Sequence, residues 1–467
     1  LKLLIFPINL NGDYSLNAFP LSTSLFEPSS FLSILLLMGV AYLVLWLLGR
    51  NKLMAFGVIW FFVALLPVSH IFPHHELMAE HYLYLPSVGF CLVTALLFEN
   101  FFKEGKYVIP LSICFMVIVI LFSVRIVDRN RDWRDRLTFW EKTLKTAPQC
   151  ARAYVNLSEI YVDAGKINEA LESAKKALTI RPNHIEGRNN LGTIYARQGL
   201  FDEAIAEFKR ALVLRPRYAK AHLNLGLSYF NTGEKDKAIS EYEQALAVNP
   251  YYAEAHNNLG VVYSSKGKLD EAIKKYRRAQ AINPSYAEPY FNLGVTYAKK
   301  AQWDKAIDEY RKVLSLNPQY TNAHNNLAIA YMKKGVLDQS ISEFKKILAT
   351  NPDDVEVRFN LGVAYAKNGE LNKAAEEYKQ AEARGLRTAE LHTNLGNIYF
   401  QQNTLNEAIR EYKQALAIKD DYAIAHNNLA MTYLKKGEYR LAIKHCDLAR
   451  ELGAVHPKLL EDLLPYR

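Results

Sequence analysis

The hexapeptide NLGVVY at residues 258–263 decides the fold, because close variants of it recur along the chain at a constant spacing. NLGVTY stands at 292–297 and NLGVAY at 360–365. The first place of the hexapeptide is always asparagine, at Asn156, Asn190, Asn224, Asn258, Asn292, Asn326, Asn360, Asn394 and Asn428. A period of about 34 residues, with leucine, a small residue and tyrosine at fixed places, is typical of a helix–turn–helix unit stacked into a solenoid.

Each landmark of the repeat has a physical reason. Leucine, the small residue and tyrosine place a broad apolar stripe on the first helix of the unit. The small residue lets the second helix approach closely. A glycine such as Gly267 falls between the two helices, where a left-handed residue is favoured, and a proline such as Pro284 helps to stop the second helix. One unit cannot bury its own apolar face, so stability comes from contacts between neighbouring units.

These residues resemble the tetratricopeptide repeat (TPR) over residues 151–455, in nine units. The resemblance implies an all-α fold, a right-handed solenoid of helical hairpins. Residues 129–150 are predicted to form a junction with a half unit, from Trp133 to Thr146, that packs on the first full repeat. Residues 456–467 are predicted to form a capping helix.

The asparagine column suggests a function for one face of the solenoid. First helices line the concave surface of TPR proteins, so the resemblance implies a ladder of amides along that groove. An amide carries two donors and an acceptor and can pair with the backbone of an extended peptide. The repeats of protein O-GlcNAc transferase are similar and hold substrate backbone in this way. The alternative is that each asparagine bonds the adjacent repeat and fixes the stacking, and the two roles are compatible.

Two further columns of polar residues share the period. Seven places after the asparagine, lysine recurs at Lys299, Lys333, Lys367 and Lys435. These lysines either attract acidic peptides to the groove or only favour the carboxyl end of their helix. Histidine recurs at His222, His256, His324, His392 and His426. Neighbouring histidines would lie about 10 Å apart, too far to share one metal ion, so we expect a stacking position and no metal or cofactor.

The stretch 1–128 has a different composition, with four long apolar runs. Runs of about 20 apolar residues are long enough to cross a bilayer. They predict a multipass membrane domain, residues 1–128, with spans at 31–49, 53–70, 82–101 and 107–127. Buried globular helices are the alternative.

Loop charges predict the orientation of this membrane domain. Loop 50–52 contains Arg50 and Lys52, loop 102–106 contains Lys103 and Lys106, and loop 71–81 contains neither lysine nor arginine. Positively charged loops favour the cytoplasmic side, so the repeats are expected on the exoplasmic side. The arginines between 125 and 136 argue against this orientation, but they alternate with aspartates. Because the chain begins with leucine, we interpret it as a fragment that lacks an N-terminal part.

A second resemblance comes from the stretch EHYLYLPS at residues 80–87. It is similar to the Glu-Arg-x-Leu-Tyr-Leu-Pro-Ser signature of the transmembrane-and-TPR O-mannosyltransferases, which are glycosyltransferases of the GT-C type. The junction RNRDW at 129–133 also resembles that family. The family implies a lipid-phosphate sugar donor, with Glu80 and His81 at a donor-phosphate site; its catalytic carboxylates would precede Leu1. A bacterial inner membrane with the repeats in the periplasm fits this relation.

Two functions follow from the sequence. The first is the acceptor-binding part of a membrane glycosyltransferase, with polypeptide in the groove. The second is a membrane-anchored scaffold without enzymatic chemistry. The net charge of +9 is spread along the chain without a nucleic-acid-binding motif, so nucleic acid is not an expected partner.

Overall fold

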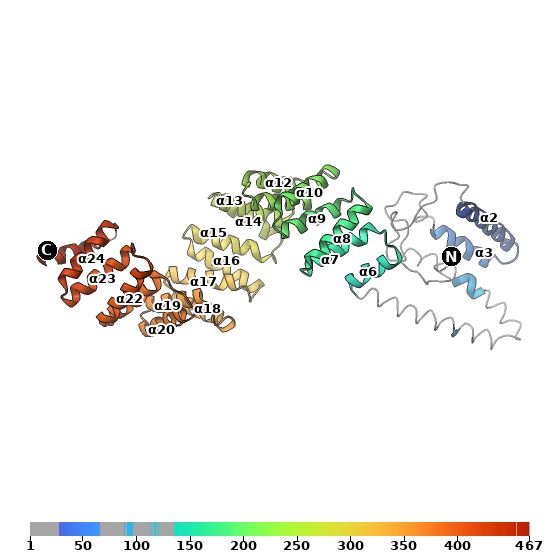
Figure 1. Ribbon diagram of the computed structural model, residues 1–467. Helices are drawn as coiled ribbons and strands as arrows, with labels where there is room; N and C mark the ends of the chain where they lie inside the picture. Colours follow the sequence, from blue (N-terminus) through green and yellow to red (C-terminus); the bar gives the residue numbers. More distant parts are fainter. Residues whose placement is uncertain are drawn as a thin grey trace. The chain divides into compact units, whose positions relative to one another are not determined.

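A computed structural model describes residues 28–65, 88, 91–96, 113, 116–117, 120, 135–453 and 455–466. Within these residues all regular structure is helical (Figure 1), which confirms the predicted all-α repeat fold. The chain divides into two compact units, Leu1–Asn249 and Pro250–Arg467, and each is described by itself.

The N-terminal part of the first unit contains α2 (Pro28–Leu48) and α3 (Lys52–Leu65), where the first two membrane spans are predicted. Leu47 packs there against Met54 and Ala55. None of the helices in the described stretches is both long and apolar enough to cross a bilayer. The predicted spans 82–101 and 107–127 lie mostly outside the described residues, as do Glu80 and His81. The membrane domain therefore stays a prediction.

The rest of the first unit consists of one single helix and three helical hairpins. The single helix α6 (Arg136–Thr146) packs on α7, and the side chain of Asp135 caps it by accepting a hydrogen bond of 2.8 Å from the Thr138 amide. The hairpins are α7 (Ala151–Asp163) with α8 (Ile167–Ile180), α9 (Ile185–Arg197) with α10 (Phe201–Leu214), and α11 (Ala219–Asn231) with α12 (Lys235–Val248).

The second unit contains six more hairpins, followed by a short helix α25 (Pro457–Leu463) and a turn of 3-10 helix η3 (Leu464–Tyr466). The hairpins are α13 (Ala253–Ser265) with α14 (Leu269–Ile282), α15 (Ala287–Lys299) with α16 (Trp303–Leu316), α17 (Thr321–Lys334) with α18 (Leu337–Thr350), α19 (Val355–Lys367) with α20 (Leu371–Ala383), α21 (Ala389–Gln401) with α22 (Leu405–Ile418), and α23 (Ala423–Lys436) with α24 (Tyr439–Glu451).

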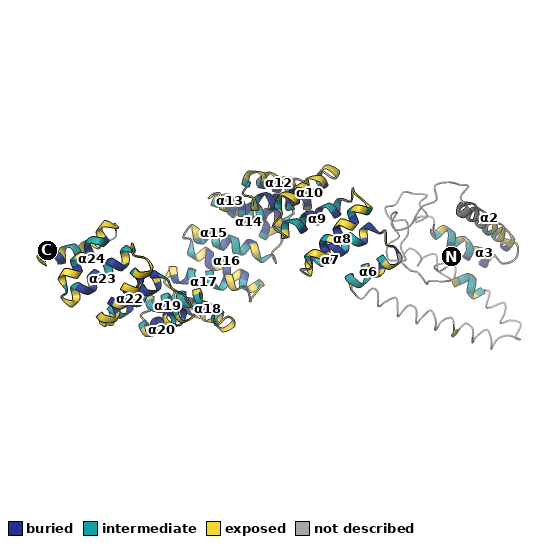
Figure 2. Ribbon diagram, in the orientation of Figure 1, coloured by how far each residue is buried: buried dark blue, intermediate teal, exposed yellow. Residues whose placement is uncertain are grey.

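The two helices of a hairpin approach closely at the small residue of the hexapeptide. A Cβ atom added to Gly294 would lie 2.6 Å from Cε1 of Tyr310, whose side chain is 1% exposed. Gly260 meets Tyr276 at the same distance. Figure 2 shows the resulting buried layer between paired helices, with exposed residues on their outer faces. The close approach agrees with the role expected for the small residue.

First helices lie on the inner side of the stack in each unit. In the second unit α13 contacts α15, and the same contact repeats between successive first helices up to α21 and α23. Consecutive second helices in the described part of this unit are not in comparable contact. A stack of hairpins curves toward the helices that touch, so the first helices form its concave side. We call this surface the first-helix face.

The short helix α25 continues the repeat in register. Buried Leu463 follows Leu429 by one full period of the repeat, and Asp462 follows Asn428 by the same interval. Leu463 and Leu459 pack in the core cluster that contains Leu429. The helix α25 therefore occupies the place of a tenth first helix and covers the end of the core.

Candidate functional site

Each first helix carries a stripe of four partly or fully exposed residues that includes its asparagine. In α15 the stripe is Glu288, Asn292, Val295 and Lys299, at i, i+4, i+7 and i+11. At about 100° per residue these four positions fall within roughly 60° of the helix circumference. Buried Leu293 faces the other way, into the hairpin. The sequence pattern therefore puts the asparagine on a surface, at the border of the core.

Four of the nine asparagines bridge consecutive first helices within a unit. Asn292 Nδ2 donates a hydrogen bond of 3.0 Å to Asn257 Oδ1, and Asn224 Nδ2 donates one of 3.1 Å to Asn189 Oδ1. Each acceptor belongs to the preceding repeat. The bridge ties one first helix to the next.

The other two bridges use different acceptors. Asn190 Nδ2 donates to the Val155 carbonyl at 3.2 Å, and Asn428 Nδ2 donates to Asn397 Oδ1 at 2.8 Å. The predicted stacking role is therefore present at these four positions. Asn156 differs, because its Nδ2 donates at 2.8 Å to a carbonyl of its own helix.

The asparagine column keeps hydrogen-bonding capacity at its surface. All nine side chains are partly exposed. Among the described residues, Oδ1 of Asn224 and of Asn292 accepts no hydrogen bond, and Asn360 makes none with its side chain. An amide oxygen offers two lone pairs, so these positions can accept from a ligand. The bridges hold four of the nine amides in fixed orientations, while binding itself stays a prediction.

The place just before the asparagine column alternates between polar and apolar residues. It reads Asn189, Leu223, Asn257, Phe291 and Asn325 in five consecutive repeats. The asparagines here supply the acceptors for Asn224 and Asn292 in the repeat that follows. The sequence signal of this two-repeat alternation, which was not used to predict the acceptors, is the pairs of adjacent asparagines at 189–190, 257–258 and 325–326.

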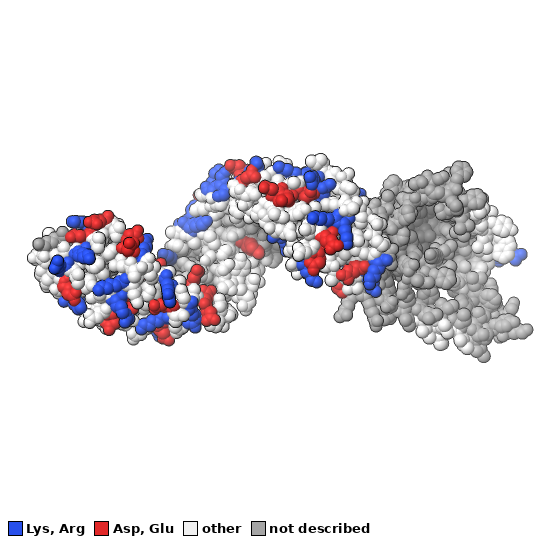
Figure 3. Space-filling model, viewed as in Figure 1, with Lys and Arg blue, Asp and Glu red and all other residues white. Residues whose placement is uncertain are grey.

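The lysine column consists of exposed cations. Lys299, Lys333, Lys367 and Lys435 are all exposed, and none forms an ion pair in the part of the chain that the structure describes. The residues that follow the first two are different, since Lys300 pairs with Asp270 and Lys334 with Asp304 of the preceding repeat. The lysine column is thus available to an anionic partner. On the face drawn in Figure 3, basic and acidic side chains are interspersed along the repeats.

The histidine column forms hydrogen bonds across the hairpin. His222 Nδ1 lies 2.7 Å from Glu241 Oε2, and its Nε2 lies 2.9 Å from the Pro216 carbonyl. Arg358 holds the same place in its repeat and donates to Glu377 at 2.9 Å. The stacking expected from sequence is seen at His426, which stacks on His445 with ring centroids 5.2 Å apart, whereas His222 forms hydrogen bonds. Glutamate recurs at the facing place on the second helix, and it provides an ionic partner instead.

Two of the five histidines in the column lack this pairing. Lys275 stands where the glutamate would be, and buried His256 Nδ1 has no hydrogen-bond partner. His445 takes that place in the last repeat, with its Nδ1 at 3.0 Å from Nδ1 of His426. No group of three metal-ligating side chains occurs among the described residues, at this column or elsewhere.

The pKa values of the histidines follow their partners. Burial lowers the pKa of His222, but hydrogen bonds to Glu241 and the Pro216 carbonyl outweigh it and raise the pKa. Burial lowers the pKa of His445 to about 4, and the neighbouring His426 contributes. Within the column, burial lowers the pKa of His256, so the column combines a histidine with a raised pKa and one with a lowered pKa.

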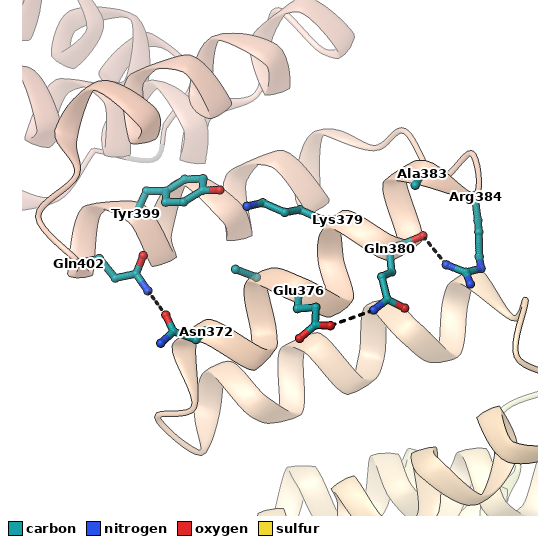
Figure 4. Close-up of a pocket in the computed structure, with 9 residues that line it drawn as sticks. Asn372, Glu376, Lys379, Gln380, Ala383, Arg384, Tyr399 and Gln402 are labelled. Atoms are coloured by element: carbon teal, nitrogen blue, oxygen red, sulfur yellow. Dashed lines mark hydrogen bonds between the residues drawn. The ribbon is translucent and has the colours of Figure 1, made fainter.

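A pocket of about 520 Å³, lined mostly by residues with polar or charged groups, opens between α20 and α21 (Figure 4). At the end of α20, Glu382 and Arg384 stand at the repeat positions that are occupied by Leu314 and Leu316 at the end of α16. Apolar packing between helices is therefore lost there. Lys379 Nζ lies 5.6 Å from the centre of the Tyr399 ring at the pocket wall. The pocket contains none of the asparagines of the column and is a separate feature.

Comparisons with known proteins agree with the repeat assignment. The family model of the cilia and flagella-associated protein 70 C-terminal domain matches residues 183–394, and a TPR repeat model matches 159–199 and 396–437. The crystal structure of MamA is 32% identical, covers 36% of this chain and 97% of MamA, and gives a TM-score of 0.32.

Curated relatives are matched over the repeats. A protein O-mannosyl-transferase of Caenorhabditis elegans is 28% identical over 189 residues, which are 39% of this chain and 26% of that protein. Protein O-mannosyl-transferase TMTC1 of Mus musculus is 26% identical over 198 residues, which are 39% of this chain and 20% of that protein. The matched region thus spans about a quarter or less of these relatives. The helical hairpins of this chain are tetratricopeptide repeats, and over them the chain is homologous to protein O-mannosyl-transferases.

Proposed function

We propose that the repeats bind an extended polypeptide along the first-helix face and present it as the acceptor of a membrane-anchored protein glycosyltransferase. The observation that carries this proposal is the asparagine column. Its amides are partly exposed and several are fixed by bridges to the preceding repeat, while acceptor oxygens such as those of Asn224 and Asn292 remain unused.

The spacing of the amides suits an extended chain. Packed helices lie about 8–10 Å apart, which corresponds to about three residues of a strand at about 3.3 Å each. One amide thus meets the polypeptide backbone about every third residue. Contacts to the backbone do not depend on the side chains of the ligand, so this mode of binding accepts many sequences.

Two observations support the glycosyltransferase part of the proposal. The relatives are named protein O-mannosyl-transferases, and EHYLYLPS at 80–87 resembles the signature of that family. In this proposal the apolar N-terminal runs anchor the chain, the repeats are exoplasmic, and Glu80 and His81 contribute to a lipid-phosphate sugar site. Tethering an acceptor beside such a site raises its effective concentration.

The test is the affinity of the full chain for a fluorescently labelled, uncharged unfolded polypeptide, measured by anisotropy. Replacing Asn326 and Asn360 by alanine removes two amides of the column. One hydrogen bond contributes about 1 kcal/mol, so we expect an affinity about tenfold or more lower with unchanged helicity. Asn406→Ala, which removes an exposed asparagine from the second helix α22, serves as the control. Unchanged affinity in the double variant rules out the proposed role of the column.

A further inference from the structure

A column of glutamates runs along the first-helix face beside the asparagines. It consists of exposed residues four places before the asparagine, Glu254, Glu288, Glu356 and Glu390. None of these forms an ion pair with a lysine, arginine or histidine in the described part of the chain. The carboxylates are therefore available to a cationic partner, just as the lysine column is available to an anionic one.

The two charged columns lie along opposite edges of the first-helix face. In α15 the glutamate is Glu288 and the lysine is Lys299, and α19 repeats the arrangement with Glu356 and Lys367. Eleven residues of helix separate the two charges by about 16 Å. Asparagine and aliphatic side chains such as Val295 occupy the surface between them. Each such helix presents an acidic edge, an amide and aliphatic middle, and a basic edge.

Helix dipoles alone do not account for this pattern. An acidic first turn and a basic last turn stabilise any helix, so both helices of a hairpin would be expected to share them. The second helices α14, α16, α18 and α22 do have acidic residues in their first turns, but none of them has a basic residue in its last turn. A basic last turn occurs in the first helices α15, α17, α19 and α23, and among the second helices of this unit in α24. The basic edge is therefore concentrated on the first helices, which form the concave side.

An extended polypeptide on this face meets both edges at once. Successive side chains of a strand point in opposite directions, so a strand over the asparagine column sends alternate side chains toward the two edges. We propose that the first-helix face of residues 250–467 prefers extended segments in which acidic and basic residues alternate. Acidic side chains meet the lysine column, and basic side chains meet the glutamate column. This preference rests on the proposed polypeptide binding and adds sequence selectivity to it.

The selectivity is cumulative, because the charges are exposed. One exposed ion pair changes affinity by about fivefold or less. Several repeats must therefore act together on one ligand. The same exposure makes the preference sensitive to salt, since screening at about 1 M shortens the range of charge interactions to about 3 Å.

Two peptides of identical composition test the proposal with the full chain. Both contain glutamate, lysine and serine in about 18 residues, which span about six repeats when extended. One alternates glutamate and lysine, and the other places all glutamates in one half and all lysines in the other. We expect the alternating peptide to bind about tenfold more tightly at low salt and the difference to vanish at about 1 M salt. Equal affinities at low salt overturn the proposal.

A pair of matched variants assigns the effect to the lysine column. Replacing Lys299 and Lys333 by glutamine is expected to remove most of the preference for the alternating peptide. Replacing Lys300 and Lys334 by glutamine removes the same charge from adjacent residues that are paired with Asp270 and Asp304, and the preference should remain. Equal losses in both variants point to net charge alone and contradict recognition by the column.

The uncharged polypeptide separates this inference from the proposed function. If the full chain binds the uncharged polypeptide and the Asn326 and Asn360 variant does not, the proposed polypeptide binding is supported. Equal affinity for the two charged peptides would then contradict only the charge preference. If neither the uncharged nor the charged peptides bind, the proposed function itself is wrong.

Discussion

Asn292 Nδ2 donates a hydrogen bond of 3.0 Å to Asn257 Oδ1, which belongs to the preceding repeat. Asn224 and Asn189 repeat this link in the other unit. The donor side of the amide therefore holds the stack together while its oxygen remains available at the surface. Stacking and ligand binding, which the sequence leaves as alternatives, are compatible within one side chain.

Asn257→Leu tests the link between stacking and binding. Leucine stands at the same place one repeat earlier, at Leu223, so the site accepts its size. The change removes the acceptor of Asn292, and we expect a loss of about 1 kcal/mol in the free energy of unfolding, measured by urea titration. Affinity for the uncharged polypeptide should fall as well, because Asn292 loses its fixed orientation. Full affinity with reduced stability would show that the bridge serves stacking alone.

Lys275→Glu is expected to stabilise the fourth repeat. It gives buried His256 Nδ1 a carboxylate partner, like the partner that His222 has in Glu241. The new pair is expected to raise the pKa of His256 above the pKa that it has in the unfolded chain. The stability added by the pair is therefore fully present below the unfolded pKa and is lost as the pH rises through the folded pKa. We expect about 1 kcal/mol near pH 6 in thermal or urea unfolding. Lys274→Glu makes the same change of charge on the exposed neighbour, and an equal gain there would contradict the pairing.

The last repeat is expected to lose stability in mild acid. Burial and His426 lower the pKa of His445 to about 4. Its ordinary pKa is about 6.5, so the contribution of the neutral ring is complete above about pH 6.5 and is lost as pH falls toward 4. Hydrogen exchange corrected for intrinsic rates should show α23 and α24 opening more at about pH 5 than at pH 7. His445→Glu should abolish this difference, and its persistence in that variant excludes His445 as the cause.

Gly294→Ala tests the close approach of paired helices. The added Cβ would lie 2.6 Å from the buried Tyr310 ring, so the ring or one of the two helices must shift. Overpacking of this kind costs about 1–3 kcal/mol, and we expect a matching loss in urea unfolding. Val295→Ala, on the partly exposed side of the same helix, is the control and should cost less. A stabilised Gly294→Ala variant would show that the helix propensity of alanine outweighs the contact.

The fold was predictable because its determinants lie within one repeat or between neighbours. The leucine, small residue and tyrosine of the hexapeptide each report one local contact, as at Gly294 and Tyr310. The histidine pairing was harder to predict, because it requires comparing two columns on different helices, such as His222 and Glu241. Leu386 stands at the position where most repeats have a proline, and the pocket beside Lys379 lies between the two helices on either side of it, α20 and α21. The period of the sequence does not reveal how far these two helices separate.

The most direct test of polypeptide binding is a structure of the full chain with the uncharged polypeptide bound. The proposed function predicts an extended backbone on the first-helix face, with its N–H groups about 3 Å from Oδ1 atoms of the asparagine column. A polypeptide seated instead in the pocket between α20 and α21, or along the second helices, would contradict it.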